Sequence, residues 1–232
     1  LVRYVVRYRI KIVRKNIRMS FPEKSSKEQK TIINAFYHHF ADILVEIIYG
    51  YRVSDEEMRE RVVFENMELL EDLARKKHGV IAYLGHMCNW EWIADVGKRF
   101  SDKSIVEYNV YRKQKNERAD RAMLLLRSKR GGECVEKQQL LRKLVQLRHA
   151  DHPFVIGLIA DQKPSPRNAH TWTTFLNQDT AFLDGGDVLA RKFDLGVIYA
   201  NITSPKRGYY RIHFEVITDN PQAMPEDEIT LT

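Results

Sequence analysis

The fold is decided by the stretch Val80-Ile81-Ala82-Tyr83-Leu84-Gly85-His86-Met87-Cys88-Asn89-Trp90-Glu91. Its first five residues form an apolar run typical of a short buried strand, and Gly85 ends that run. The chain then continues as Trp92-Ile93-Ala94-Asp95-Val96, a pattern that predicts a helix. A strand, a turn and a helix start bring side chains and backbone N–H groups to one place, so we expect a ligand site here.

The spacing between His86 and Glu91 indicates how the two side chains are used. On one regular helix, five residues turn through about 500° and leave two side chains about 140° apart. We therefore place His86 in the turn, with Asn89 as the helix N-cap and Glu91 in the first helical turn. From there the carboxylate is expected to reach the imidazole. A histidine held in this way can take a proton from an alcohol, which suits acyl transfer.

A less specific interpretation stands beside this one. His86 would only satisfy buried backbone groups, and Glu91 would only complement the helix dipole. Short motifs match by chance often enough that the pair alone does not decide between the two.

Composition limits the possible classes of protein. The 232 residues are 44% hydrophobic, which suits one α/β domain with a full core. The two cysteines, Cys88 and Cys134, have no metal-ligand or disulfide spacing, so we expect no metal and a reducing, cytosol-facing location. The net charge of +7 predicts an anionic partner: nucleic acid, lipid headgroups or an acidic carrier protein.

The N-terminal segment up to Phe21 has basic residues but no acidic one. As a helix, it would carry an apolar stripe within an arc of about 60°. That stripe is Val6, Ile10, Val13 and Ile17, and it is flanked by Arg3, Arg7, Lys11, Arg14 and Arg18. This pattern is typical of a helix on an anionic membrane surface. The alternatives are a strand over Tyr8–Ile12, and a core helix whose basic face is merely solvated.

The rest of the chain alternates between strand and helix patterns. We predict a single α/β domain with a mostly parallel central sheet flanked by helices. N-terminal amphipathic helices, which would associate with the membrane, are expected over residues 1–50, and the α/β core over residues 60–218. Ligands bind at the carboxyl ends of such strands, where His86, Arg112 and Asp161 are expected to emerge. No apolar run of 18 residues is present, so no membrane-spanning segment is predicted.

Several blocks of residues occur in the order found in a known family. The blocks are Gly85-His86-x-x-Asn89-Trp90-Glu91, Val110-Tyr111-Arg112, Arg127-x-x-Arg130-Gly131, Ala160-Asp161-Gln162, and Phe175 through Leu189-Ala190-Arg191. Together they resemble the bacterial lysophospholipid acyltransferase-like proteins, and most closely the lipid A late acyltransferases that transfer lauroyl and myristoyl groups. The HxxxxE motif carries most of the resemblance, because each later block alone is weak.

The resemblance implies a glycerol-3-phosphate acyltransferase-like fold and a catalytic role for two residues. His86 would be the general base on a lipid hydroxyl, and Glu91 its orienting partner. The hydroxyl would attack the thioester of an acyl carrier protein or acyl-CoA directly, without an acyl-enzyme and without a cofactor. The acceptor would be a lipid A precursor. The enzyme would lie at the cytoplasmic face of the bacterial inner membrane, peripheral or held by an anchor preceding Leu1.

The resemblance also implies a set of substrate-binding residues: Asn89, Arg112, Arg127, Arg130, Asp161 and Gln162. Forked arginine donors suit phosphate or glycolipid oxygens, although each arginine could instead be an ordinary surface charge. Asp161 and Gln162 would bind substrate or only cap the turn at the strand end.

Two positions depart from the family pattern. Cys88 and Asn177 stand where the family often has glycine. A thiol two residues from His86 suggests a second possible mechanism, in which Cys88 is the nucleophile and becomes acylated. We favour the direct mechanism, because neighbouring residues in a turn usually point apart and a small cysteine often serves packing.

Two other functions fit the sequence. One is an acyltransferase acting on a different acceptor: a lysophospholipid, a glycolipid or an amino-acid lipid. The other is a basic protein without chemistry that binds membranes or nucleic acid. The chain has no recognition-helix, zinc-finger or aromatic RNA-binding pattern, which argues against nucleic acid.

Overall fold

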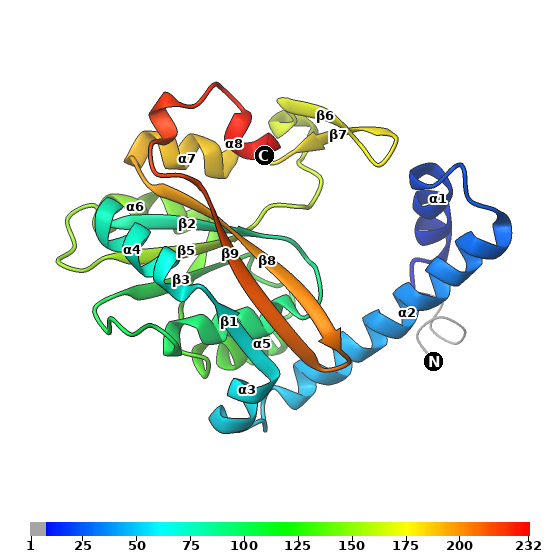
Figure 1. Cartoon of the computed structure of the whole chain (residues 1–232), viewed down its shortest axis with the longest axis horizontal. Helices are drawn as coiled ribbons and strands as arrows, with labels where there is room; N and C mark the ends of the chain where they lie inside the picture. Colours follow the sequence, from blue (N-terminus) through cyan, green and yellow to red (C-terminus); the bar gives the residue numbers. More distant parts are fainter. Residues whose placement is uncertain (1–7) are drawn as a thin grey trace.

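The computed structural model describes residues 8–232, and Figure 1 shows how their helices and strands are arranged. The α-helices are α1 (Ile10–Ser20), α2 (Ser26–Tyr49), α3 (Asp55–Arg61), α4 (Met67–Lys77), α5 (Glu117–Ser128), α6 (Leu140–Leu147), α7 (Gly185–Phe193) and α8 (Glu228–Leu231). Short 3-10 helices are η1 (Trp90–Lys98), η2 (Lys137–Gln139), η3 (Pro166–Asn168) and η4 (Pro221–Ala223). The strands are β1 (Val62–Glu65), β2 (Gly79–Leu84), β3 (Val106–Tyr111), β4 (Glu133–Glu136), β5 (Phe154–Ile159), β6 (Thr171–Phe175), β7 (Gln178–Phe182), β8 (Gly196–Lys206) and β9 (Tyr209–Thr218).

A seven-stranded sheet in the order β1-β9-β8-β2-β5-β3-β4 forms the centre of the domain. Its described pairings are parallel apart from the β8–β9 pair, which is antiparallel. The predicted α/β fold with a mostly parallel sheet flanked by helices is therefore confirmed. Strands β6 and β7 form a separate antiparallel hairpin.

The central strand β2 explains why both faces of the sheet are covered. All six of its residues are buried. Val80, Ala82 and Leu84 point into one core, which includes side chains of α4 and η1. Ile81 and Tyr83 point into a second core with side chains of α6 and α7. Alternate residues of a strand face opposite sides of the sheet, so an unbroken apolar run needs helices on both.

Helices α1 and α2 form an arm that stands beside the α/β core (Figure 1). Ser25 and Glu28 form a capping box at the start of α2, with both reciprocal hydrogen bonds. Helix α1 contacts α2, and Ile10, Val13 and Ile17 are half-buried. The predicted helix is thus confirmed from Ile10 onward, and the strand alternative is wrong there. The described part of the apolar stripe, from Ile10 to Ile17, is therefore half-buried in the protein. The predicted positions Arg3, Val6 and Arg7 lie outside the described residues.

Three local predictions differ from the structure. The helix after Asn89 is the 3-10 helix η1 and not an α-helix. The β6–β7 hairpin, whose turn places Leu176 and Asn177 at positive φ, was not predicted from the sequence. The stretch after Asn220, which lacks a core pattern, nevertheless buries Ile229. In the part of the chain described, every helix is too short or too polar to cross a bilayer.

Glu107 on β3 predicts a pH-dependent stability. Burial raises the pKa of its carboxyl group to about 8 from 4.5, although the N–H of Gly97 donates to it. Between these pH values the folded protein keeps a proton that the unfolded chain loses. The stabilisation that this proton gives to the folded protein is therefore complete below the unfolded pKa of Glu107, and it is lost as pH rises toward about 8.

We expect Glu107→Gln to remove this dependence, because an amide does not titrate. The variant's free energy of unfolding, relative to that of the unsubstituted protein, should rise by on the order of 1 kcal/mol for each pH unit between the unfolded and the folded pKa of Glu107. Urea unfolding at several pH values measures the difference. A constant difference at all pH values would contradict a proton bound at Glu107.

Candidate active site

The pairing of β2 with β5 brings His86 beside Asp161. The two strands are parallel and in register from Gly79 with Phe154 to Leu84 with Ile159, a constant offset of 75 residues. Beyond the last pair, the same offset places His86 level with Asp161. Parallel strands end at the same sheet edge, so both side chains emerge at one place, as the sequence predicted.

The Asp161 carboxylate holds His86 at two points. Its Oδ2 accepts a hydrogen bond from the backbone N–H of His86 at 2.7 Å, and its Oδ1 lies 2.6 Å from the ring Nδ1. Burial alone raises the pKa of Asp161, but the hydrogen bonds from His86 outweigh burial and lower it. An ionised Asp161 accepts a hydrogen bond from Nδ1–H, and in the neutral form of the ring this tautomer leaves the lone pair on Nε2.

The Nε2 atom faces Gln162, whose side-chain nitrogen lies 3.2 Å away. An amide N–H is a donor, so this contact fits an unprotonated Nε2. The Trp90 ring meets the imidazole edge to face, with ring centroids 4.8 Å apart. The His86 side chain is 30% exposed, which leaves the ring accessible from solvent.

Glu91 does not meet the imidazole as predicted. It is buried, and its carboxylate accepts hydrogen bonds from Arg127 Nε at 2.8 Å and Nη2 at 2.7 Å. The indole N–H of Trp90 donates to the same carboxylate at 3.1 Å. These donors occupy the carboxylate, and among the described residues the His86 ring has its hydrogen-bonding contacts with Asp161 and Gln162. Trp90 links the two predicted catalytic residues instead.

Asn89 stands at the N-cap position of η1, but its side chain does not cap the helix. It is only 2% exposed, and its amide donates to the Glu46 carboxylate at 2.9 Å. The hydroxyl of Tyr210 donates to the same oxygen of Glu46 at 2.6 Å. The predicted capping role is therefore wrong, because the Asn89 side chain instead ties the turn that carries His86 to α2. Neither Glu46 nor Tyr210 carries a sequence signal that identifies it as this partner.

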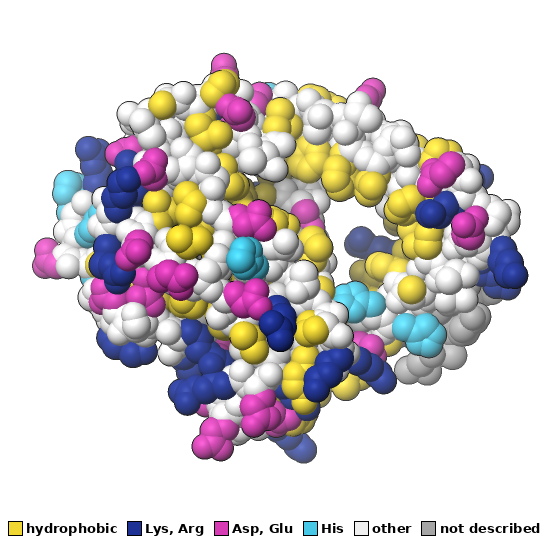
Figure 2. All heavy atoms as spheres, viewed as in Figure 1, with side chains coloured by type: hydrophobic (Ala, Val, Ile, Leu, Met, Phe, Trp, Pro, Cys, Tyr) yellow, Lys and Arg dark blue, Asp and Glu magenta, His cyan; other side chains and the backbone are white. Residues whose placement is uncertain are grey.

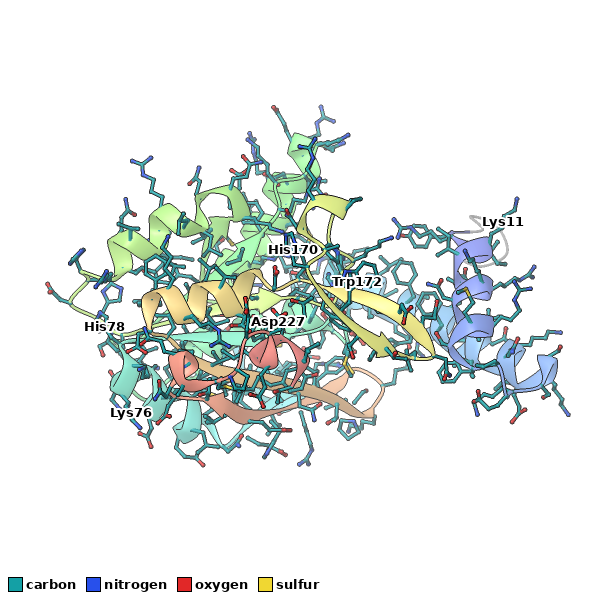
Figure 3. The ribbon with its side chains drawn as sticks, turned by 90° about the horizontal axis from the view of Figure 1, so that it is seen from above. Lys11, Lys76, His78, His170, Trp172 and Asp227 are labelled. Carbon is teal, nitrogen blue, oxygen red and sulfur yellow. The ribbon has the colours of Figure 1, made fainter. Side chains whose placement is uncertain are left out.

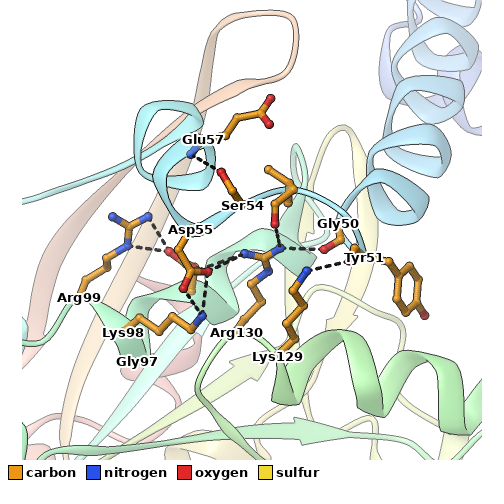
Figure 4. A network of polar contacts seen from close by, with 12 residues as sticks. Gly50, Tyr51, Ser54, Asp55, Glu57, Gly97, Lys98, Arg99, Lys129 and Arg130 are labelled. Carbon is orange, nitrogen blue, oxygen red and sulfur yellow. Dashed lines mark hydrogen bonds and ion pairs between the residues drawn. The ribbon is translucent and has the colours of Figure 1, made fainter.

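The three predicted arginines have different surroundings. Arg127 is bound to Glu91, as described above. Arg130 is 1% exposed, and it donates to the backbone carbonyl of Gly50 at 2.7 Å, so it holds the segment between α2 and α3 (Figure 4). The Arg130 side chain is therefore neither an exposed surface charge nor open to a phosphate ligand.

Arg112 alone of the three is exposed. It follows β3, which pairs with β5 from Val106 with Phe154 to Asn109 with Gly157. Continuing this register places Arg112 level with Ala160, at the same sheet edge as His86. Among residues 8–232, its guanidinium has no ion-pair partner and is available to a ligand.

A small cavity of about 50 Å³ lies next to Glu91. Its lining is mostly apolar, with Glu91, Glu107, Asn109 and Arg127 as the polar members. One water needs roughly 10–15 Å³ of such volume, so the cavity has room for a few waters and not for a fatty acyl chain. In the described part of the chain, no cluster of His, Cys, Asp or Glu could hold a metal ion.

Cys88 has the features of a structural thiol. It is half-buried, its Sγ lies 3.7 Å from the carbonyl oxygen of Ile202, and burial raises the pKa of its thiol. A thiol nucleophile needs a lowered pKa. The backbone of Cys88 has φ 51°, in the left-handed region that favours glycine, and this explains why glycine suits the position. Asn177, the other departure, has φ 60°.

We expect Cys88→Ala to keep most of the acyl-transfer activity that the sequence predicts, because the geometry gives the thiol no chemical role. Cys88→Gly should be at least as stable as the unsubstituted protein, because it relieves the left-handed backbone. Turnover assays and thermal melts measure both effects. Near-complete loss of turnover in a folded Cys88→Ala protein would restore the thiol mechanism.

The buried pair of Glu91 and Arg127 yields a separate prediction. Arg127→Met should destabilise the fold by about 3–5 kcal/mol, because it leaves a buried carboxylate without its cation. Adding Glu91→Leu should recover part of that loss. As a matched control, Arg211→Met at the exposed pair with Glu65 should cost about 0–1 kcal/mol. Urea unfolding measures all three, and equal losses at the two pairs would contradict a buried structural pair.

The sequence was also compared with known protein families and with curated proteins. A family model described as bacterial lipid A biosynthesis acyltransferase matches residues 1–231. A comparison with curated proteins finds no match. The family match covers nearly the whole chain, including the arm, the β2 strand end with His86, and Asp161.

Proposed function

Because the chain belongs to the bacterial lipid A biosynthesis acyltransferase family, we propose that it transfers a fatty acyl chain from a thioester to a hydroxyl of a lipid A precursor, with His86 as general base. The observation that carries the proposal is the contact of His86 Nδ1 with Asp161 at 2.6 Å. It leaves Nε2 as the proton acceptor and supplies a negative charge for the imidazolium that forms.

The reaction proceeds in one displacement. The acceptor hydroxyl takes the place of the Gln162 amide at Nε2 and gives its proton to the ring. Its oxygen forms a bond to the thioester carbonyl carbon, and the carbon–sulfur bond then breaks. The departing thiolate takes the proton back from the imidazolium. Asp161 holds the Nδ1–H throughout, so His86 returns to its starting tautomer without an acyl-enzyme.

Glu91 acts in this proposal as a positioning residue. Arg127 fixes the carboxylate from one side, and the carboxylate in turn accepts from the Trp90 indole N–H. The Trp90 ring then fixes the edge of the imidazole. In the HxxxxE motif, Glu91 thus acts on His86 indirectly, through Trp90, which lies between the two residues in the sequence.

The surroundings of the site suit a lipid and a phosphate-bearing substrate. Figure 2 shows a hollow between the α/β core and the arm, bordered by hydrophobic side chains. The β6–β7 hairpin borders this hollow on one side and reaches the arm, where Asn177 donates a hydrogen bond to the carbonyl of Ser20 at 3.1 Å. Arg112 is the open cation for a phosphate. The donor in this proposal is acyl carrier protein or acyl-CoA.

We place the enzyme at the cytoplasmic face of the inner membrane, peripheral or held by a separate anchor. The absence of a spanning helix among the described residues is compatible with either. Other lipid acceptors use the same chemistry and differ only in the contacts made around Arg112. A protein without catalysis, considered from charge alone, does not fit membership of an enzyme family.

The mechanism predicts the effect of two substitutions. His86→Ala should abolish transfer, because no other base faces the hydroxyl. Asp161→Asn should lower kcat by roughly 10²–10⁴-fold with little change in KM, since an amide neither fixes the tautomer nor stabilises imidazolium. The exposed Asp151→Asn is the matched control and should be unchanged. The assay follows radiolabelled acyl transfer to a lipid A precursor, and retained turnover in His86→Ala would refute the assignment.

A further inference from the structure

A concave basic pocket lies between α1 and α2, well away from His86. Its volume is about 520 Å³. The lining residues are Lys11, Arg14, Lys15, Arg18, Ser26, Gln29, Lys30 and Ile33. Five of these eight are cations and none is acidic. In Figure 3, Lys11 points outward from the arm, on the side away from the α/β core.

The five pocket cations lie together without a carboxylate partner in the described part of the chain. Partly buried arginines such as Arg61, Arg127 and Arg191, in contrast, each have one. The nearby carboxylate of Glu28 is occupied by the backbone N–H and hydroxyl of Ser25. Positive charge gathered in a concave site without a counter-charge predicts an anionic ligand.

The outer surface of α1 indicates the kind of ligand. At about 100° per residue, Lys11, Arg14, Lys15 and Arg18 occupy one arc of about 100°, on a side away from the half-buried Ile10, Val13 and Ile17. Ile12 and Met19 border that arc and are 53% and 39% exposed. Cations beside exposed apolar side chains are typical of a helix lying in a membrane interface. An acidic protein partner would account for the cations but leaves the two apolar side chains unexplained.

We propose that this pocket binds the phosphate groups of anionic membrane lipids and seats the arm on the bilayer surface. The arginines supply forked donors to phosphate oxygens, the lysines supply point charges, and Ile12 and Met19 enter the headgroup boundary. The pocket is a docking site and not an acceptor subsite, because it is lined by the arm alone and its Lys11 points away from the α/β core that carries His86 (Figure 3). The proposal does not depend on the chemistry at His86.

The test is vesicle co-sedimentation of the whole chain. One set of vesicles contains phosphatidylcholine alone, and the other contains equal parts of phosphatidylcholine and phosphatidylglycerol. The pocket variant is Lys15→Gln with Arg18→Gln and Lys30→Gln. The matched control is Lys137→Gln with Arg142→Gln and Arg148→Gln, three exposed cations elsewhere with the same loss of charge. A second variant, Ile12→Ser with Met19→Ser, tests the apolar contact.

We expect the pocket variant to lose roughly tenfold or more in binding to the anionic vesicles, and the control to lose much less. The apolar variant should also bind more weakly. Acyl transfer to a detergent-solubilised acceptor should be unchanged in all three, which separates this proposal from the proposed function.

Three outcomes would overturn the proposal. Equal losses in the pocket variant and the control would mean that only net charge matters. Saturable binding of inorganic phosphate at the pocket, without a pocket-dependent difference on vesicles, would indicate a free-phosphate site. Pocket-dependent binding of an acidic acyl carrier protein, with vesicle binding unaffected, would identify a protein dock instead.

Discussion

The parallel, in-register pairing of β2 with β5 is the constraint on which the site depends. Both strands are apolar runs that end at the same sheet edge, and in each case one residue separates the strand end from His86 or Asp161. The Asp161 carboxylate can therefore accept from both the backbone and the ring of His86. A slip of one residue would turn the strand's side chains to the opposite faces of the sheet and separate the two groups. The chemistry follows from strand geometry more than from the local motif.

Buried polar contacts hold the turn that carries His86. Arg127 fixes Glu91, Glu46 fixes Asn89, and Arg130 fixes the backbone after α2. The first two contacts join the segment after His86 to helices distant in sequence, α5 and α2, and the third joins the ends of those two helices to each other. A buried charge that loses its partner costs several kcal/mol, so these contacts constrain the turn more strongly than exposed ion pairs would. In the proposed mechanism, Glu91 positions Trp90 and, through it, the imidazole.

Much of the fold was predictable because it depends on periodicity. The apolar run before Gly85 and the later strands were identified, and Asp161 was expected at the carboxyl end of its strand. The partner of His86 was not predictable, because sequence patterns do not specify which strands are neighbours. The expected contact of Glu91 with His86 rested on the spacing and on the family resemblance, and it ignored Arg127, which is 36 residues away in the chain. The β6–β7 hairpin was missed because its strands are short, exposed and polar in pattern.

The most direct test of the central claim is the tautomer of His86, measured by nitrogen NMR of protein with labelled histidine. The account predicts a neutral ring protonated at Nδ1, with a signal that shifts strongly in Asp161→Asn and only slightly in Glu91→Gln. A ring protonated at Nε2, or a signal that responds to Glu91→Gln and not to Asp161→Asn, would contradict it.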